Sequence, residues 1–126
     1  MSDCGVPGQE RQVCNLEYLL VNLGRNRAAA RRLVGLFLEN HPKLINRLDD
    51  AVSRQDALAL KDAVHDIRSS CVLFSAQDAV ALARNIEQEL QHRCADASWT
   101  EDVVRLKREM ALVAEELAGY LAEDEL

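Results

Sequence analysis

The sequence predicts an all-α protein: an up-and-down antiparallel four-helix bundle with one or two additional helices at its N-terminus. Apolar residues recur at helical spacing along most of the chain, and no stretch alternates apolar and polar residues as a half-buried strand does. The chain has only two prolines and five glycines and is rich in Ala, Leu, Glu and Arg, which are good helix formers. Short connections between the predicted helices favour antiparallel neighbours.

The length of 126 residues is that of one domain. Gly5, Pro7 and Gly8 predict that residues 1–13 form a flexible N-terminal lead, and residues 14–126 are expected to form the helical domain. The first ten residues are too polar for a signal peptide, and no apolar run reaches the roughly 18 residues that a membrane span needs. The four cysteines form no C-x-x-C pair. We therefore expect a cytoplasmic protein with reduced thiols and no membrane partner.

The N-terminal third of the chain predicts three short helices. The first spans residues 16–23 and ends at Gly24, which suits a helix C′ position. The second runs from about residue 26 to 39, and we expect Asn40-His41-Pro42 to end it, because proline disrupts a helix interior. Pro42 then suits the first turn of a third helix. The inward side chains expected on the second and third helices are Ala29, Leu33, Leu36, Phe37, Leu44, Ile45, Leu48, Ala51 and Val52.

Three longer helices follow. The first of them has Asp56 as its N-cap and ends near residue 73 or 74. The next opens at Ser75-Ala76-Gln77-Asp78, which resembles a capping box, and runs to about residue 93. The last opens at Ser98-Trp99-Thr100-Glu101, a better capping box. The inward positions of these last two helices are Val80, Ala83, Ile86, Leu90, Val103, Leu106, Met110, Val113, Leu117 and Tyr120.

The helix that begins after Asp56 has two distinct sides. Its apolar stripe consists of Leu60, Ala63, Val64, Ile67, Cys71 and Phe74. His65 is two residues from Ile67 and so points roughly 200° away from it, at about 100° per residue. Lys61, Arg68 and Ser69 lie one turn from His65 on the same polar side. The pattern predicts an imidazole that faces outward between two cations.

Phosphoryl transfer suits this arrangement. An imidazole is largely neutral and nucleophilic near pH 7. Phosphoryl transfer needs mainly positioning and charge stabilisation, and the cations of Lys61 and Arg68 can both meet phosphoryl oxygens. His65 is therefore the candidate nucleophile.

Two other uses of His65 fit less well. A metal site would want a second histidine at i+4, and Asp62 and Asp66 are weak substitutes; the histidine, cysteine and aspartate within residues 92–96 are another sparse cluster. We expect no metal site. A hydrolase would need a water-excluding cleft beside the neighbouring serines, which a convex helix surface does not offer.

The formal net charge of −6 argues against nucleic acid as a partner, because phosphate contacts need a basic face. Basic residues do cluster locally, at Arg25, Arg27, Arg31 and Arg32. This cluster is either a solvated helix face or a contact patch for an acidic partner.

The residues from His65 onward also resemble a known family. Residues 65–76, with the sequence HDIRSSCVLFSA, are similar to the signature of histidine phosphotransfer (HPt) domains: His, any residue, Leu, Lys, Gly, Ser, small residues, then Leu-Gly-Ala. Residues 82–87 resemble its continuation, which ends in a hydrophobic residue and Glu. Residues 33–42 resemble the family's Leu-x-x-x-Phe…Pro helix pair. The resemblance covers roughly residues 15–120.

The resemblance implies a phosphoryl carrier without autonomous kinase activity. His65 would accept and donate a phosphoryl group, exchanging it with the aspartate of response-regulator receiver domains; the partners would be such receivers and a hybrid sensor histidine kinase. Arg68 takes the place of the family's lysine and, with Lys61, would assist the phosphoryl group. Glu87 would hydrogen-bond the imidazole. No cofactor belongs to this chain, because the Mg²⁺ used in transfer would belong to the receiver. A monomer is expected.

The departures from the signature define the alternatives. Ser69 stands where the family usually has Gly, and with Ser70 it forms the small polar surroundings of the acceptor; Ser75 replaces a second Gly and Phe74 a Leu. These departures leave open a pseudo-HPt interaction module that binds a receiver domain or kinase without carrying phosphate. A plain helical adaptor, with the histidine incidental, is a third possibility.

The partner surface should surround the histidine. Besides the first two helices, the residues expected to dock the partner are Lys61, Val64, Arg68, Ser69 and Val72.

Overall fold

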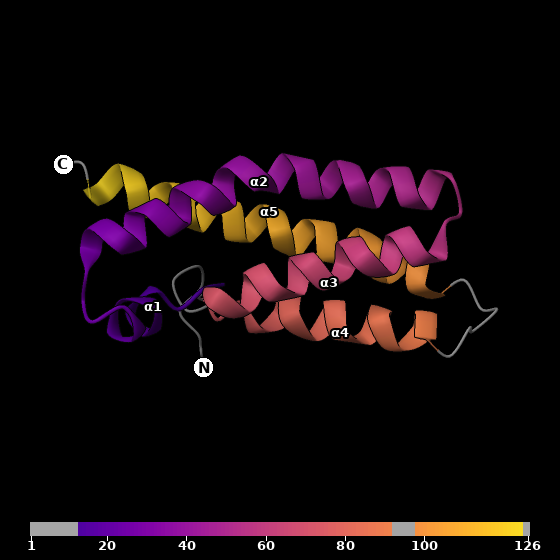
Figure 1. Cartoon of the computed structure of the whole chain (residues 1–126), viewed down its shortest axis with the longest axis horizontal. Coiled ribbons are helices and arrows are strands. Elements are labelled where there is room, and N and C mark those ends of the chain that lie inside the picture. The colour runs from indigo at the N-terminus through magenta and orange to yellow at the C-terminus, as the bar shows by residue number, and fades with distance from the viewer. Residues whose placement is uncertain (1–12, 92–97, 125–126) are drawn as a thin grey trace, which may run out of the picture.

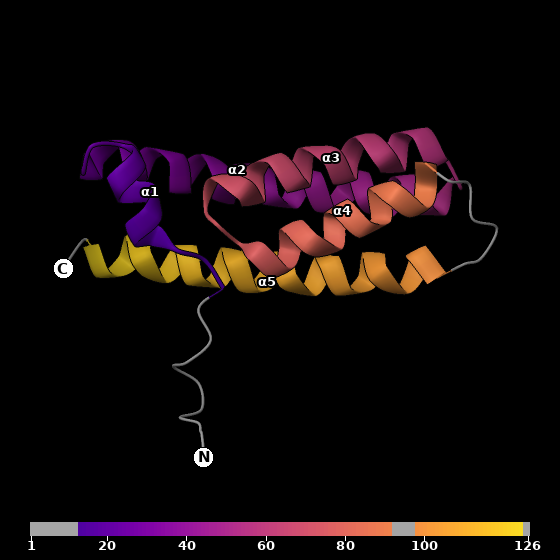
Figure 2. The same ribbon diagram turned by 90° about the horizontal axis from the view of Figure 1, so that it is seen from below.

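A computed structural model describes residues 13–91 and 98–124, and within them all regular structure is helical. The helices are α1 (Leu16–Asn22), α2 (Arg27–Ser53), α3 (Ala57–Leu73), α4 (Gln77–Gln91) and α5 (Ser98–Asp124). Helices α2 to α5 lie side by side as an antiparallel bundle, and α1 crosses the end where α2 begins and α5 finishes (Figures 1 and 2). The predicted all-α bundle is confirmed. The proposed lead falls almost entirely on residues 1–12, outside the described residues.

The core runs along the axis of the bundle and fixes the rotation of each helix. All six members of the predicted stripe on α3 are buried, which confirms that prediction. Phe74, at the C-terminal end of α3, packs edge-to-face on Phe37 of α2, with ring centroids 5.4 Å apart. Because Val64 and Ile67 are fully buried, the opposite face of α3 must point to solvent.

The predicted break at Pro42 is wrong, because α2 continues through it to Ser53. Proline in a helix interior costs about 3 kcal/mol. Burying a large apolar side chain contributes about 1.5–3 kcal/mol, and Phe37 and Leu48, on either side of the exposed Pro42, are both buried. Tertiary packing therefore outweighs the local penalty. The predicted second and third helices are one helix, which leaves α1 as the additional N-terminal helix among the described residues.

Treating residues 26–39 as a separate helix also misplaced its inner face. Leu36, predicted to be inward, is half-exposed. The buried residues of this segment are Ala30, Val34 and Phe37. The continuous helix takes its rotation from the whole row of contacts down to its C-terminal end, so a few residues at one end do not determine it.

The turns between helices rely on residues with left-handed backbone conformation. Gly24 follows α1 with φ 65°, as predicted for a C′ residue. Asp56 caps α3, its side chain accepting from the N–H of Ala59, which confirms that prediction. The predicted capping role of Ser75 is wrong: its φ is 55°, and its N–H donates to the carbonyl of Val72, so it ends α3 and does not open α4.

Two of the four cysteines lie among the described residues, and both are buried. Burial is the main cause that raises the pKa of the Cys14 and Cys71 thiols to about 12. Cys71 behaves as the small core residue that was predicted. Among the described helices, none combines the length and apolar character that crossing a membrane requires.

Candidate functional site

His65 lies in the middle of α3 on the face opposite the core stripe. Its side chain is 56% exposed. The N-cap at Asp56 sets the start of the helix, and the buried neighbours Val64 and Ile67 prevent it from rotating. The imidazole is therefore carried by a rigid element and open to solvent, as the helical periodicity predicted.

A carboxylate from α4 meets the imidazole. Glu87 Oε2 lies 3.3 Å from His65 Nδ1, and Glu87 Oε1 accepts a hydrogen bond from Arg68 Nε. Arg68 Nη2 is 3.2 Å from His65 Nδ1, so the three side chains lie together, and the tautomer of the ring decides whether Nδ1 bonds to Glu87 or to Arg68. Glu87 is only 15% exposed, and the buried residues Ala83 and Ile86 hold its helix against the bundle.

The surroundings of Glu87 keep it ionised. Burial alone would raise its pKa, but hydrogen bonds from Arg68 and His65 outweigh burial, and the pKa of Glu87 lies below its ordinary value. An ionised carboxylate favours the imidazole tautomer with its proton on Nδ1, since that N–H can donate to Oε2. The guanidinium of Arg68 can only donate, so it cannot bond to a protonated Nδ1. The Nε2 lone pair then points away from this pair, and the geometry suits a nucleophile.

Of the remaining predicted site residues, some can reach a partner from the surface of α3 and one cannot. Lys61 and Ser70 are partly buried and Ser69 is exposed, all near His65 on α3. Val72, predicted to dock a partner, is 50% exposed. Val64 is fully buried, so its predicted docking role is wrong. Val64 belongs to the core stripe, and a residue cannot face the core and a partner at once.

A groove runs beside the C-terminal half of α3 and has a volume of about 510 Å³. Its walls include Tyr18 of α1, Val72 of α3, and Val80 and Arg84 of α4. Tyr18 is 51% exposed although it is aromatic. Sequence reasoning expected a contribution from the first helices but did not identify Tyr18 or Arg84. The exposed aromatic residue on a short helix was the available signal for Tyr18.

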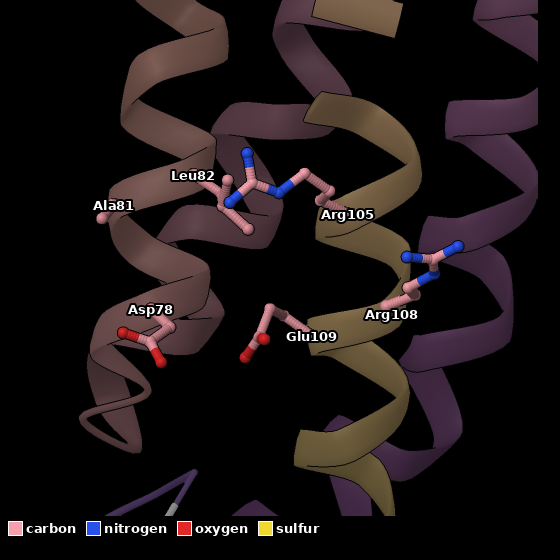
Figure 3. Close-up of a pocket in the computed structure, with 6 residues that line it drawn as sticks. All are labelled: Asp78, Ala81, Leu82, Arg105, Arg108 and Glu109. Atoms are coloured by element: carbon pink, nitrogen blue, oxygen red, sulfur yellow. The ribbon is translucent and has the colours of Figure 1, made fainter. Parts of the chain in front are cut away.

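A second groove, of about 540 Å³, lies between α4 and α5. Figure 3 shows Glu109 reaching from α5 toward α4, which carries Asp78, and Arg105 and Arg108 on the preceding turn of α5. Its lining residues include no histidine, cysteine or hydroxyl group. This groove therefore offers no imidazole, thiol or hydroxyl nucleophile, and the candidate functional site is the one on α3.

Within residues 13–91 and 98–124, no group of three or more His, Cys, Asp or Glu side chains is placed to hold a metal ion. The sparse cluster noted at residues 92–96 lies outside the described part of the chain. Of the arginine cluster at the start of α2, Arg25 pairs with Glu17 at 2.9 Å and Arg31 donates to the carbonyl of Leu121. These contacts suit a helix face that braces the end of the bundle.

Comparison with known proteins agrees with this geometry. A family model described as the Hpt domain matches residues 32–119. The chain also resembles a crystal structure of the HPT domain from an Hpt sensor hybrid histidine kinase of Shewanella, with a TM-score of 0.78 and 14% sequence identity. That match covers 88% of this chain and 95% of the other, and at such low identity it shows a shared fold. No curated protein matches the chain.

Proposed function

The chain belongs to the Hpt domain family, whose members take part in histidine phosphotransfer in two-component phosphorelays, and we propose that His65 is its phosphoryl acceptor. In this proposal His65 exchanges the phosphoryl group with the aspartate of a response-regulator receiver domain. The contact between His65 Nδ1 and the ionised Glu87, which Arg68 holds in place on an exposed helix face, carries the proposal. It supports a protonated Nδ1 and an outward Nε2.

The proposed step is a direct transfer. The Nε2 lone pair attacks the phosphorus of the receiver's aspartyl phosphate, an N–P bond forms, and the P–O bond to the aspartate breaks. The aspartate leaves as a carboxylate. Nδ1 keeps its proton, so the ring gains positive charge, and the ionised Glu87 beside it stabilises that charge. Transfer to a second receiver is the reverse of this step.

The cations around the acceptor would stabilise the phosphoryl group. Arg68 holds Glu87 through Nε, and other N–H groups of its guanidinium can meet phosphoryl oxygens. Lys61, one turn before His65, can approach from the other side. Ser69 and Ser70 are small, so they leave room for a partner and can hydrogen-bond the phosphoryl group.

Receiver domains and hybrid sensor kinases are the partners that this proposal requires, and the docking surface would include Ser69 and Val72. Receiver active sites are acidic, so the local cations Lys61, Arg68 and Arg84 suit them despite the net charge of −6. Any Mg²⁺ would be held by the receiver. We expect a monomeric, cytoplasmic carrier without kinase activity of its own.

Labelling with a phosphorylated receiver tests the proposal. The wild-type chain should acquire an acid-labile, alkali-stable label, and His65→Gln should not. His41→Gln and His92→Gln are matched controls that test the other two histidines of the chain, and both should still be labelled. Unaltered labelling of His65→Gln would overturn the assignment. If no variant is labelled but the receiver still binds, the pseudo-HPt interaction module is the better description.

A further inference from the structure

Helix α1 is too short to hold its own position. It has seven residues, and isolated helices of that length are not stable in water. One residue of α1, Leu19, is fully buried against the bundle. Leu16, Leu20 and Leu23 are partly buried against the core, and the residues before α1 add hydrogen bonds to other parts of the bundle.

A carboxylate from α5, far away in sequence, anchors the residues before α1. Glu116 Oε2 accepts from the N–H of Val13 at 3.0 Å, and Glu116 Oε1 accepts from the N–H of Cys14 at 2.8 Å. The N–H of the next residue, Asn15, donates to the carbonyl of Phe74 at 2.9 Å. The three residues immediately before α1 are thus tied to α5 and to the turn between α3 and α4.

This anchor sets one wall of the groove beside the C-terminal half of α3. Tyr18, in the first turn of α1, faces the groove that Val72 lines from α3. Val72 follows His65 by seven residues, which is about 10 Å along a helix. A partner that reaches His65 can therefore also reach Tyr18, provided that α1 is in place.

We propose that Glu116 is a positioning residue for partner docking: its carboxylate holds α1 so that Tyr18 and Val72 together receive the receiver domain. Glu116 touches neither His65 nor the partner in this scheme. The inference rests on the proposed function, because that function identifies the occupant of the groove. The groove suits a receiver, with apolar Val72 and Val80 along its walls and Arg84 beside them to meet an acidic surface.

A merely structural role for Glu116 would have a different signature. It would lower stability and leave the affinity of folded molecules for the receiver unchanged. A positioning role acts on docking, so it raises KM and leaves the rate of the bound complex alone. If α1 is correctly placed in only about a tenth of molecules, the apparent affinity falls about tenfold.

The test is Glu116→Gln, with Glu115→Gln as the matched control, since Glu115 is the exposed neighbour on the same helix. The probe is a receiver domain of the same genome, selected because it labels the wild-type chain. We expect the KM of Glu116→Gln for the phosphorylated receiver to rise about tenfold, with kcat unchanged. Amide hydrogen exchange should become faster at residues 13–23 and stay unchanged in α3. Faster exchange in α1 with an unaltered KM would overturn the inference.

Tyr18→Ala provides a second variant if Glu116→Gln does not fold. Tyr18 is half-exposed, so its loss should leave the fold intact and still raise KM; an unchanged KM would overturn the inference.

Titration with the unphosphorylated receiver separates the two proposals. A wild-type chain that binds the receiver but takes no label overturns the proposed function alone, and the ratio of Kd values for Glu116→Gln and wild type then decides the role of Glu116. If no receiver binds the wild-type chain, both proposals fail.

Discussion

The acceptor face on α3 and α4 and the groove wall on α1 are held in place by different means. His65 and Glu87 stand on long helices whose inner faces are packed along the core. Tyr18 stands on a seven-residue helix that has one fully buried leucine and a few partly buried ones, and the residues before it are held by one backbone hydrogen bond and the carboxylate of Glu116. The packing of the whole bundle therefore fixes the imidazole of His65, whereas the position of Tyr18 in the proposed docking surface depends on fewer contacts. Changes at the two regions should therefore alter different quantities.

The largest separable effect should come from Arg68→Ala. This change removes a cation from the acceptor and a hydrogen bond from Glu87. Removing one preorganised donor from a developing anion typically costs about 100-fold or more in rate, so we expect transfer from a saturating phosphorylated receiver to slow about 100-fold in single-turnover experiments. KM should rise much less than the rate falls, because Lys61 and Arg84 remain to meet the acidic receiver. Arg108→Ala, on the α4–α5 groove, is the control and should have no effect; equal losses of rate and affinity in Arg68→Ala would contradict its phosphoryl role.

A matched pair of valines on α3 sharpens the comparison between core and surface. Val64→Ala removes a fully buried side chain and should lower the free energy of unfolding by about 1–3 kcal/mol. Val72→Ala, at a half-exposed position, should change it by less than about 0.5 kcal/mol but raise KM for the receiver. Urea unfolding and transfer kinetics measure the two effects. The opposite assignment, with Val64→Ala acting on KM alone, would contradict the orientation of α3.

The lowered pKa of Glu87 predicts that its contribution to the free energy of unfolding is lost in acid. Its pKa is lowered in the folded protein because the hydrogen bonds from Arg68 and His65 outweigh burial. A lowered folded pKa stabilises the protein above the unfolded value, near 4.5, and that contribution is lost as pH falls through the folded value. The urea midpoint of the wild type should therefore decline more steeply below about pH 5 than that of Glu87→Gln. Parallel curves would show that Glu87 does not couple to folding.

The smallest expected effect belongs to the turn after α3. Ser75 has φ 55°, a conformation that costs an L-residue about 1 kcal/mol and that glycine adopts freely. Ser75→Gly should therefore raise the free energy of unfolding by roughly 0.5–1 kcal/mol, with no change in transfer rate. Thermal unfolding of Ser75→Gly and wild type measures it. A loss of stability would mean that the hydroxyl makes a contribution that outweighs the strain.

Helical periodicity in the sequence was sufficient to predict which side of a single helix faces the core. The stripe from Leu60 to Phe74 predicted the outward direction of His65, and the resemblance of residues 82–87 to the HPt pattern suggested Glu87 as its partner. Pro42 was misread because its local penalty is visible in sequence, whereas the packing of Phe37 and Leu48 that outweighs it is tertiary.

Contacts between distant residues were beyond sequence reasoning. Glu116 meets the backbone of Cys14 across 102 positions, and backbone N–H groups carry no residue-specific signal. The groove beside α3 likewise needs Tyr18 and Val72 brought together from separate helices. The left-handed conformation of Ser75 had a local signal, the glycine that HPt domains usually carry there, but the serine in this chain also fitted a helix cap.

The site of phosphorylation on the imidazole ring tests the central claim most directly. The chain, labelled with ¹⁵N in its histidines and phosphorylated by a receiver domain, can be examined by ³¹P and ¹⁵N NMR. We predict a phosphorus–nitrogen coupling to Nε2 of His65, with the proton retained on Nδ1 beside Glu87. Phosphate on Nδ1, or on any other residue, would contradict the account.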